Sequence, residues 1–336
     1  MQGQAGSEAG VADYRGICTM NIVYFGSGQF GIKCLDAIAL SKHSITYIVT
    51  QPPRPAGRNR KPRPTPVASW AASRSVRLIE TANANERTIV DQIAEAKPDL
   101  IVVIAFGQKV SKELTELPPN GAINVHSSLL PKYRGAAPIT WAIVNGEAET
   151  GISIITLAEK MDAGQILAQS RTPIGPDETA GELHDKLAEL SAPLLMETID
   201  EIGNGTAVYK EQDHSKATLA PKLNKSDGRI DFARDADVIQ RQIRGFWPWP
   251  GASAGYISQA GGKMTRVTIA MAEIVEASNP PPSAPGTLDA NLNVTCGRNA
   301  IRITQIKPEG SRLMAFKAFA NGRNITPGDT FVKIDG

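Results

Sequence analysis

The sequence predicts an α/β protein: a Rossmann-like, mostly parallel sheet with helices on both faces, followed by a smaller C-terminal OB-like β-barrel domain. Three observations favour this fold class. Short β-branched runs alternate with amphipathic helix patterns over the first two hundred residues, which is typical of βαβ units. Runs such as IVVIA lack polar alternation, as expected for strands covered on both faces. After residue 203, short β-like runs are broken by Gly/Pro turns.

The elements of the first part can be placed in order along the chain. Strands are expected at residues 21–25, 45–50, 99–105, 122–125 and 151–157. Helices are expected at residues 29–40, 65–74, 85–96, 110–114, 136–145 and 179–203. Ligands of parallel sheets gather at the carboxyl ends of the strands, so we expect the functional site at that edge.

The composition divides the chain into four segments. The first segment is polar, rich in Gly and Ala, and lacks the apolar stretch of a secretory signal, so we expect a disordered extension; Met20, directly before the first strand, is a possible alternative start. One helix is expected in the barrel domain, at 235–245. The expected segments are 1–19 (extension), 20–203 (α/β domain), 204–222 (linker) and 223–336 (β-barrel-like domain).

Cysteine usage and hydropathy indicate a cytoplasmic protein. Cys18, Cys34 and Cys296 are odd in number, widely spaced and form no C-x-x-C pair. This pattern argues against a disulfide framework or a structural zinc site and fits a reducing cytoplasm. The four histidines show no metal-ligand spacing, and no apolar run approaches the roughly 20 residues of a membrane-spanning helix. We therefore expect no metal and no membrane association, and a monomer.

The net charge of +2 conceals an asymmetry between the two parts of the chain. From Lys222 to the end there are 15 Lys/Arg and 10 Asp/Glu residues. The rest of the chain has 21 Lys/Arg and 24 Asp/Glu residues. The C-terminal third is therefore the basic part. Such an excess is compatible with a polyanionic partner and also with an ordinary solvated surface.

The stretch GSGQFG, residues 26–31, follows the first strand and matches the G-x-G-x-x-G pattern of a dinucleotide-binding turn. That site also needs an acid at the end of the second strand, about 20 residues on. Here the second strand ends Val49-Thr50-Gln51, and the next acid is Glu80. We expect no NAD, and we assign the glycines to a tight strand-to-helix turn and to close helix–sheet packing.

A basic, proline-rich segment leaves the carboxyl end of the second strand: QPPRPAGRNRKPRPTP, residues 51–66. Proline excludes regular helix and central strand there and stiffens the segment, so we expect a semi-rigid projecting loop. Its cations suit phosphate contacts and guanidinium stacking, the alternative being an exposed charged loop. The basic residues are Arg54, Arg58, Arg60, Lys61 and Arg63.

The most informative chemistry lies in residues 121–141, GAINVHSSLLPKYRGAAPITW. Asn124 and His126 are two apart on a strand, so their side chains share one face at its carboxyl end. Asp162 follows the neighbouring strand on a loop, which places the three at adjacent strand ends. An imidazole or carboxylate can take an amine proton, and an amide or imidazole N–H can donate to an oxyanion. The set suits acyl transfer to an amine; the alternative is a structural N-x-H pair.

The run NVHSSLLPKYRGAAP with the later MDAG resembles the signature of the folate-dependent formyltransferase family, N-x-H-x-S-L-L-P, R-G-x-x-P and D-x-G. The resemblance covers residues 20–336 and is closest to members acting on initiator tRNA. It implies formyl transfer from 10-formyltetrahydrofolate to the amino group of methionine on initiator tRNA, within a catalytic domain over 20–203 and a tRNA-binding domain over 223–336. It carries catalysis onto Asn124, His126 and Asp162. It carries folate contacts onto Ser128, Leu129, Leu130, Pro131, Ile104, Phe106 and Gly107.

Two features favour the tRNA-dependent branch over relatives with small substrates. The segment 51–66 resembles that branch's basic insertion loop, which implies tRNA contacts for the five cations named above. The second feature is the basic C-terminal domain.

The run Phe246-Trp247-Pro248-Trp249 suits either base stacking or the junction between the domains. The alternatives are a sugar-nucleotide N-formyltransferase and an RNA-binding module with an inactive transferase domain. Gly26-Ser27-Gly28-Gln29-Phe30 departs from the family's G-T-P-x-F.

Overall fold

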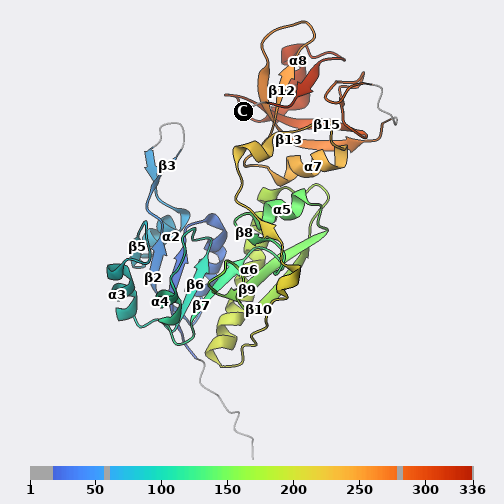
Figure 1. Ribbon diagram of the computed structural model, residues 1–336. Coiled ribbons are helices and arrows are strands. Elements are labelled where there is room, and N and C mark those ends of the chain that lie inside the picture. Colours follow the sequence, from blue (N-terminus) through green and yellow to red (C-terminus); the bar gives the residue numbers. More distant parts are fainter. Residues whose placement is uncertain (1–17, 57–60, 278–282, 335–336) are drawn as a thin grey trace, which may run out of the picture.

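The computed structural model describes residues 18–56, 61–277 and 283–334 (Figure 1). The extension predicted over residues 1–19 lies almost wholly outside these ranges, as do Arg58 and Arg60 of the basic segment. Among the helices in the described ranges, none combines the length and apolar character needed to cross a membrane.

The first part of the chain is built on a seven-stranded sheet with the strand order β10-β9-β7-β6-β1-β2-β5. Five neighbouring strands, from β7 to β5, are parallel. Strand β9 runs antiparallel to β7, and β10 antiparallel to β9. The strands are β1 (Asn21–Gly26), β2 (Ser44–Thr50), β5 (Leu78–Glu80), β6 (Leu100–Ile104), β7 (Ala122–His126), β9 (Glu149–Thr156) and β10 (Ile166–Pro173).

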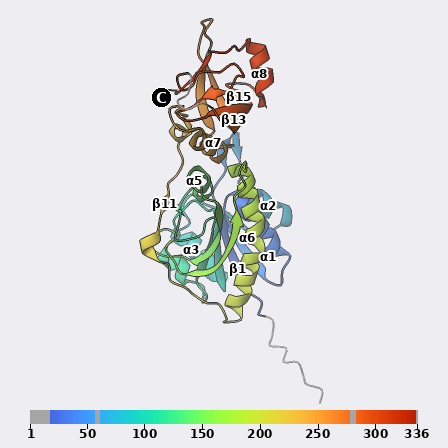
Figure 2. The same ribbon diagram turned by 90° about the vertical axis from the view of Figure 1, so that its right-hand side faces the viewer.

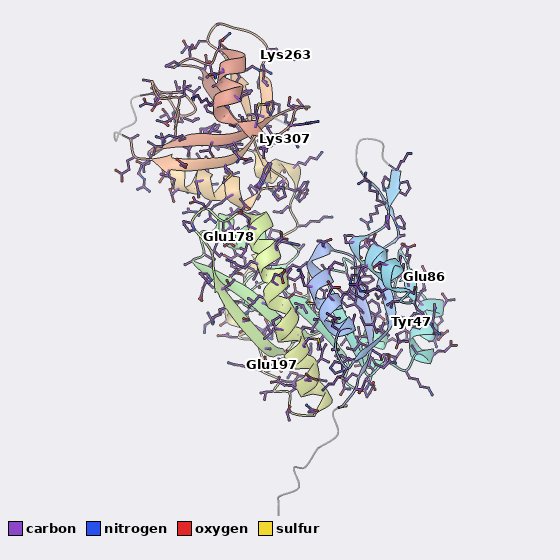
Figure 3. All side chains as sticks on the ribbon, turned by 180° about the vertical axis from the view of Figure 1, so that it is seen from behind. Tyr47, Glu86, Glu178, Glu197, Lys263 and Lys307 are labelled. Carbon is purple, nitrogen blue, oxygen red and sulfur yellow. The ribbon has the colours of Figure 1, made fainter. Side chains whose placement is uncertain are left out.

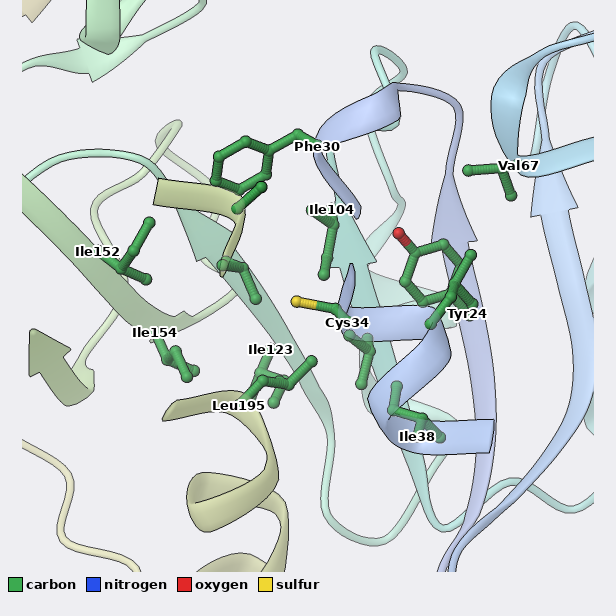
Figure 4. Packing of buried hydrophobic residues seen from close by; sticks show 14 of the residues in the cluster. Tyr24, Phe30, Cys34, Ile38, Val67, Ile104, Ile123, Ile152, Ile154 and Leu195 are labelled. Carbon is green, nitrogen blue, oxygen red and sulfur yellow. The ribbon is translucent and has the colours of Figure 1, made fainter. Parts of the chain in front are cut away.

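Helices cover both faces of this sheet, as predicted (Figure 2). On one face, α1 (Ile32–Ala39), α2 (Pro66–Arg74) and α6 (Ala180–Gly203) pack against alternate strand residues such as Tyr24 and Ile123 (Figure 4). Helices α3 (Arg87–Glu95) and α4 (Lys112–Glu116) cover the opposite face. Helix α6 begins at a capping box in which the Thr179 and Glu182 side chains bond each other's backbone amides, which satisfies two otherwise unpaired donors.

The glycines of GSGQFG serve packing. Gly26 ends β1, and a Cβ there would lie 2.5 Å from Tyr24 Cε1 and 2.8 Å from the Ile104 carbonyl. A Cβ on Gly31 would collide with the Tyr24 hydroxyl. Only hydrogen fits at Gly26 and Gly31. The turn between β1 and α1, which includes η1 (Gln29–Gly31), packs closely against the buried Tyr24 and against β6.

The basic segment is more regular than the loop that the sequence predicts. It forms a separate two-stranded hairpin of β3 (Arg54–Ala56) and β4 (Lys61–Arg63). The hairpin projects beyond the seven-stranded sheet, toward the side on which the C-terminal part of the chain lies (Figure 1). Pro55 and Pro62 stand opposite each other, which an isolated two-stranded ribbon tolerates because proline need not donate to a further strand.

The C-terminal part is an antiparallel sheet with the order β14-β15-β13-β12-β17 and β16 beside β15. Backbone bridges from Thr287 to Thr330 and from Leu288 to Val294 join its two ends, so the sheet is nearly closed. The predicted fold class is confirmed; helix α8 was not predicted. The elements are α7 (Ala236–Gly245), β12 (Ala252–Ile257), β13 (Thr265–Val275), β14 (Val294–Thr295), β15 (Ala300–Pro308), β16 (Met314–Ala315), α8 (Phe316–Arg323) and β17 (Thr330–Val332).

Helix α7 meets α5 (Pro138–Val144) where the two parts join. Phe246 is buried there against Trp141, whereas Trp249 is 54% exposed. The Arg244 guanidinium donates to the Glu178 carbonyl at 3.0 Å. Figure 3 shows Glu178 at the end of the α/β part that faces the C-terminal part. The F-W-P-W run therefore contributes both to the junction and to the surface.

The segment over 204–222 runs back along the α/β domain. Its strand β11 (Leu219–Ala220) pairs in parallel with β8 (Arg134–Gly135), which precedes α5. Its short helix η2 (His214–Lys216) comes earlier, and η3 (Lys225–Gly228) follows the segment. These contacts bring the segment beside the loops that carry the predicted site.

Candidate active site

The last strand of the parallel set, β7, presents two polar side chains on one face. Ile123 and Val125 point into the core beneath α6. Because strand residues alternate between faces, Asn124 and His126 point to the opposite face, at the carboxyl end of β7. This is the placement that the sequence predicts for both residues.

His126 is held in one tautomer by a backbone contact. Its side chain is 6% exposed, and its Nε2 lies 2.9 Å from the carbonyl oxygen of Tyr133. A carbonyl can only accept a hydrogen bond, so we assign the ring proton to Nε2. The lone pair of the neutral ring is then on Nδ1, which lies 3.6 Å from Asp162 Oδ2. A proton taken up at Nδ1 is therefore stabilised by the carboxylate.

Asp162 reaches His126 by a route that differs from the prediction. The sequence places Asn124, His126 and Asp162 at adjacent strand ends. However, β9 is antiparallel to β7, so its carboxyl end lies beside the start of β7, where Thr156 pairs with Ile123. The loop between β9 and β10 nevertheless brings Asp162 to the histidine.

The carboxylate and the backbone of Asp162 are both anchored. The Gly135 amide donates to Oδ2 at 2.8 Å. Asp162 has a φ of +53°, a conformation that is uncommon for residues other than glycine. The Gln212 side-chain amide donates to the Asp162 carbonyl at 2.9 Å and to the Gly164 carbonyl at 2.7 Å. The loop is therefore fixed by groups that lie far away in the sequence.

Asn124 is half-buried, and among the described residues its side-chain amide has no hydrogen-bond partner. By contrast, the side-chain amide of Gln51, which follows β2, is bonded to the Phe106 carbonyl at 2.7 Å. A half-buried amide without a protein partner can bind a ligand oxygen, so the chemistry of the residue fits the predicted role of holding a carbonyl group.

The residues predicted to bind folate are divided among three environments. Phe106 and Gly107 border a cleft of about 490 Å³ at the carboxyl ends of β1, β2 and β6. Leu129, Leu130 and Pro131 border a separate cavity of about 250 Å³. Ile104 and Ser128 are fully buried, and the Ser128 hydroxyl donates to the Lys132 carbonyl at 2.7 Å. Neither cavity is lined by the Asn–His–Asp group.

The basic hairpin stands at the mouth of the larger cleft. Arg54 and Arg63 line it together with Ser27 and Gly28 of the opening glycine motif, and Lys61 is exposed farther along the hairpin. Within the described ranges, none of these three cations forms an ion pair with a carboxylate. They are available to an anionic ligand.

Three groups that hold the site were missed by the sequence analysis. The Tyr133 carbonyl and the Gly135 amide are backbone groups, and their only signal is their position within the K-Y-R-G run. Gln212 lies in the segment predicted as a linker, and its sequence neighbourhood shows no pattern. Over the part of the chain that the structure describes, no group of three His, Cys, Asp or Glu side chains could hold a metal ion.

The fold and this site define an α/β transferase whose Asn, His and Asp side chains suit transfer of an acyl group. Residues 20–199 match the formyl transferase family, and residues 222–324 match the formyl transferase C-terminal domain. The chain belongs to the formyl transferase family.

Curated relatives align over nearly their whole length. The methionyl-tRNA formyltransferase of Citrifermentans bemidjiense is 37% identical over 320 residues, covering 94% of this chain and 98% of the relative. The enzyme of the same name from Alkaliphilus oremlandii is 38% identical over 315 residues, covering 92% and 99%. The one from Caldanaerobacter subterraneus is 39% identical over 311 residues, covering 92% and 99%.

Solved structures share the fold at low sequence identity. HypX from Aquifex aeolicus in complex with tetrahydrofolic acid has a TM-score of 0.58 at 16% identity, covering 90% of this chain and 47% of that one. WlaRD, a sugar 3N-formyl transferase, has a TM-score of 0.60 at 15% identity, covering 87% and 99%. These likenesses establish a common architecture.

Proposed function

We propose that this protein transfers the formyl group of 10-formyltetrahydrofolate to the α-amino group of methionine carried on initiator tRNA. One observation carries the chemistry: the buried His126 imidazole has its Nδ1 lone pair 3.6 Å from the Asp162 carboxylate, and it shares a strand face with the Asn124 amide, which no described residue bonds. The substrate assignment is supported by relatives of that name that align over nearly their whole length.

His126 is the proton acceptor in this proposal. Its Nε2 proton is engaged by the Tyr133 carbonyl, so Nδ1 takes the proton that the amine loses as it attacks the formyl carbon. Asp162 lies beside Nδ1 and stabilises the imidazolium that results. The neutral ring has a single N–H, which the Tyr133 carbonyl accepts. Donation to the oxyanion, the other role that the sequence suggests for His126, is therefore open only to Nδ1 after it has taken up a proton.

Asn124 orients the formyl group and donates to its oxygen as negative charge develops there. Its amide requires no rearrangement to do so, because the described residues leave it unbonded. Donors placed in advance where charge develops are among the largest contributions to acyl transfer. The folate cosubstrate supplies the formyl group: as the tetrahedral adduct collapses, the bond between the formyl carbon and N10 breaks, N10 takes the proton held at His126 Nδ1, and tetrahydrofolate leaves. The 104–107 loop and the Leu129–Pro131 turn are proposed to hold the folate.

The tRNA is proposed to contact the basic hairpin and the C-terminal domain. Arg54 and Arg63 line a cleft at the carboxyl ends of the strands, which is the edge that carries His126. Lys263 and Lys307 are among the cations on the C-terminal domain (Figure 3). Phosphate neutralisation by such cations provides most of the sequence-independent affinity for nucleic acid.

The unpaired cysteines favour action in the cytoplasm. The monomeric state remains a prediction that analytical ultracentrifugation tests.

One assay distinguishes this function from the alternatives. Purified protein is incubated with 10-formyltetrahydrofolate and either methionine-charged initiator tRNA or a UDP- or dTDP-linked amino sugar, and the formylated product is identified by mass spectrometry. Formylmethionine released from the tRNA supports the proposal. A formylated sugar alone would replace it with a sugar-nucleotide transferase. Tight tRNA binding without product would indicate an inactive binding module.

The variants Asn124→Ala and His126→Ala test whether the reaction belongs to this site. Both should reduce turnover by orders of magnitude while circular dichroism and the unfolding midpoint remain close to those of the wild type. Turnover near the wild-type rate in either variant would show that the assignment of the site is wrong.

A further inference from the structure

We infer that Gln212 is a positioning residue for the reaction, because it holds Asp162 in the conformation that faces His126. The inference rests on the proposed function for its kinetic test. It gives a role in catalysis to the segment between the domains, which the sequence predicts only as a linker.

Gln212 uses its whole side-chain amide at the site. The Nε2 group donates to the carbonyls of Asp162 and Gly164, at 2.9 and 2.7 Å. The Oε1 atom accepts from the Nε and Nη2 atoms of Arg134, at 3.2 and 2.6 Å. The residue is 5% exposed. These four hydrogen bonds fix the orientation of the buried amide. If the amide were flipped, its NH2 group would face the N–H donors of Arg134 and its oxygen would face the two carbonyl oxygens.

These contacts fix the two ends of Asp162 in a consistent way. The Asp162 carbonyl is bound by Gln212, and the Asp162 carboxylate is bound by the Gly135 amide at 2.8 Å. Gly135 follows Arg134, which is the residue that Gln212 also binds. The Gln212 side chain therefore holds together two segments: the loop that carries Asp162, and the Arg134–Gly135 turn, whose Gly135 amide binds the Asp162 carboxylate.

The backbone of Asp162 requires such support. Its φ of +53° lies in a sparsely populated region for a residue with a side chain, and such conformations persist only where the surroundings hold them. The other backbone bonds of the loop lie beside or beyond Asp162: the Ala163 amide bonds to the Lys160 carbonyl at 3.2 Å, and at the base of the loop Thr156 bonds Gln165 through its Oγ1 at 3.0 Å and its amide at 2.9 Å. Without Gln212, the loop loses the donors to two of its carbonyls.

The test compares Gln212→Glu with Gln212→Met. The glutamate variant keeps an oxygen for Arg134 and adds an ion pair with it, but it replaces the donor to the two carbonyls by an acceptor. The methionine variant has a similar length and loses all four hydrogen bonds. Gln165→Met is the matched control, because that glutamine lies three residues from Asp162 and bonds the exposed Glu211 of the same segment, at 2.8 Å.

We expect Gln212→Glu to reduce kcat by about 10- to 100-fold, the effect of losing two hydrogen bonds that orient a catalytic group. KM for both substrates should stay within about twofold, since the residue touches neither. The unfolding midpoint of the glutamate variant should not fall below that of Gln212→Met. The control should retain the wild-type kcat. A purely structural role predicts that kcat follows stability across the two variants.

A measurement without substrate separates this inference from the proposed function. Amide hydrogen exchange over residues 158–166 should accelerate in both Gln212 variants and remain unchanged in Gln165→Met. If the wild-type protein formylates no tRNA, the proposed function fails, and exchange alone decides whether Gln212 holds the loop. Unchanged exchange in both Gln212 variants would overturn the inference. If the wild type is active, an unchanged kcat in both variants would also overturn it.

Discussion

Replacing Asp162 by asparagine tests the electrostatic core of the proposed mechanism. The substitution preserves the shape of the side chain and keeps an oxygen for the Gly135 amide, which now donates to Oδ2 at 2.8 Å. Asparagine also tolerates a φ of +53° better than most residues do. The variant should therefore fold normally, and only the negative charge facing His126 is lost.

The size of the effect follows from the distance between the two groups. His126 Nδ1 and Asp162 Oδ2 are 3.6 Å apart, and their side chains are 6% and 12% exposed. At an effective dielectric constant of about 20, two unit charges at this separation attract by about 4.6 kcal/mol. If that attraction is made only after His126 takes the proton, its loss lowers kcat by about 2,000-fold.

The assay is steady-state formylation of charged initiator tRNA at saturating substrate, with a urea unfolding curve for each protein. Asp185→Asn is the matched control, because Asp185 also contacts a histidine, His184 at 2.9 Å, but its side chain is on the solvent-exposed side of α6. We expect the control to keep its rate. The mechanism is refuted if Asp162→Asn keeps kcat within about threefold of the wild type, or if its loss of rate is matched by unfolding.

Three further predictions concern binding and stability. Arg54→Ala and Arg63→Ala should each weaken tRNA binding and lower the slope of log Kd against log salt by about 0.7 to 0.9, without changing KM for the folate donor; unchanged slopes would remove the hairpin from the tRNA interface. Tyr256→Phe deletes the 2.6 Å hydrogen bond to the buried Asp329 carboxylate and should cost about 1.5 to 3 kcal/mol in urea unfolding; an unchanged midpoint contradicts this. Burial lowers the pKa of His43, so the unfolded chain binds the proton more readily and the wild type should lose stability below about pH 6.5. His43→Asn should reduce that slope, and an equal slope would show that His43 is not the source.

The helices other than α8, and the parallel strands of the seven-stranded sheet other than the three-residue β5, could be read from the sequence because their signals are local. The helix predicted at 179–203 is observed at Ala180–Gly203, since its start is fixed by a capping box between Thr179 and Glu182. The strand directions were harder to predict. A helix pattern between two strands favours a parallel crossover, yet β9 is antiparallel to β7, and α5, which lies between them in the sequence, packs chiefly on α7 of the C-terminal part. That contact lies about a hundred residues away.

The side chains proposed to react were predictable from the sequence, but most of the groups that hold them in place were not. Asn124, His126 and Asp162 fall within motifs whose residue types suggest proton transfer and oxyanion binding. The carbonyl that sets the His126 tautomer belongs to the backbone of Tyr133. Because every residue has a backbone carbonyl, the residue type at position 133 does not predict this contact. Gln212 acts from a distance of 50 residues along the chain, and only the folded structure places it beside Asp162.

The course of the segment after α6 determines where the chain can be divided. A fragment ending at Gly203 would contain every strand of the seven-stranded sheet and all three reacting side chains. It would lack Gln212 and the strand β11 that pairs with Arg134 and Gly135. It would also lack the Pro221 carbonyl that accepts from the Trp141 indole at 2.8 Å. The functional unit therefore extends to about residue 221, and exchange of C-terminal domains between relatives must keep this segment with its own catalytic half.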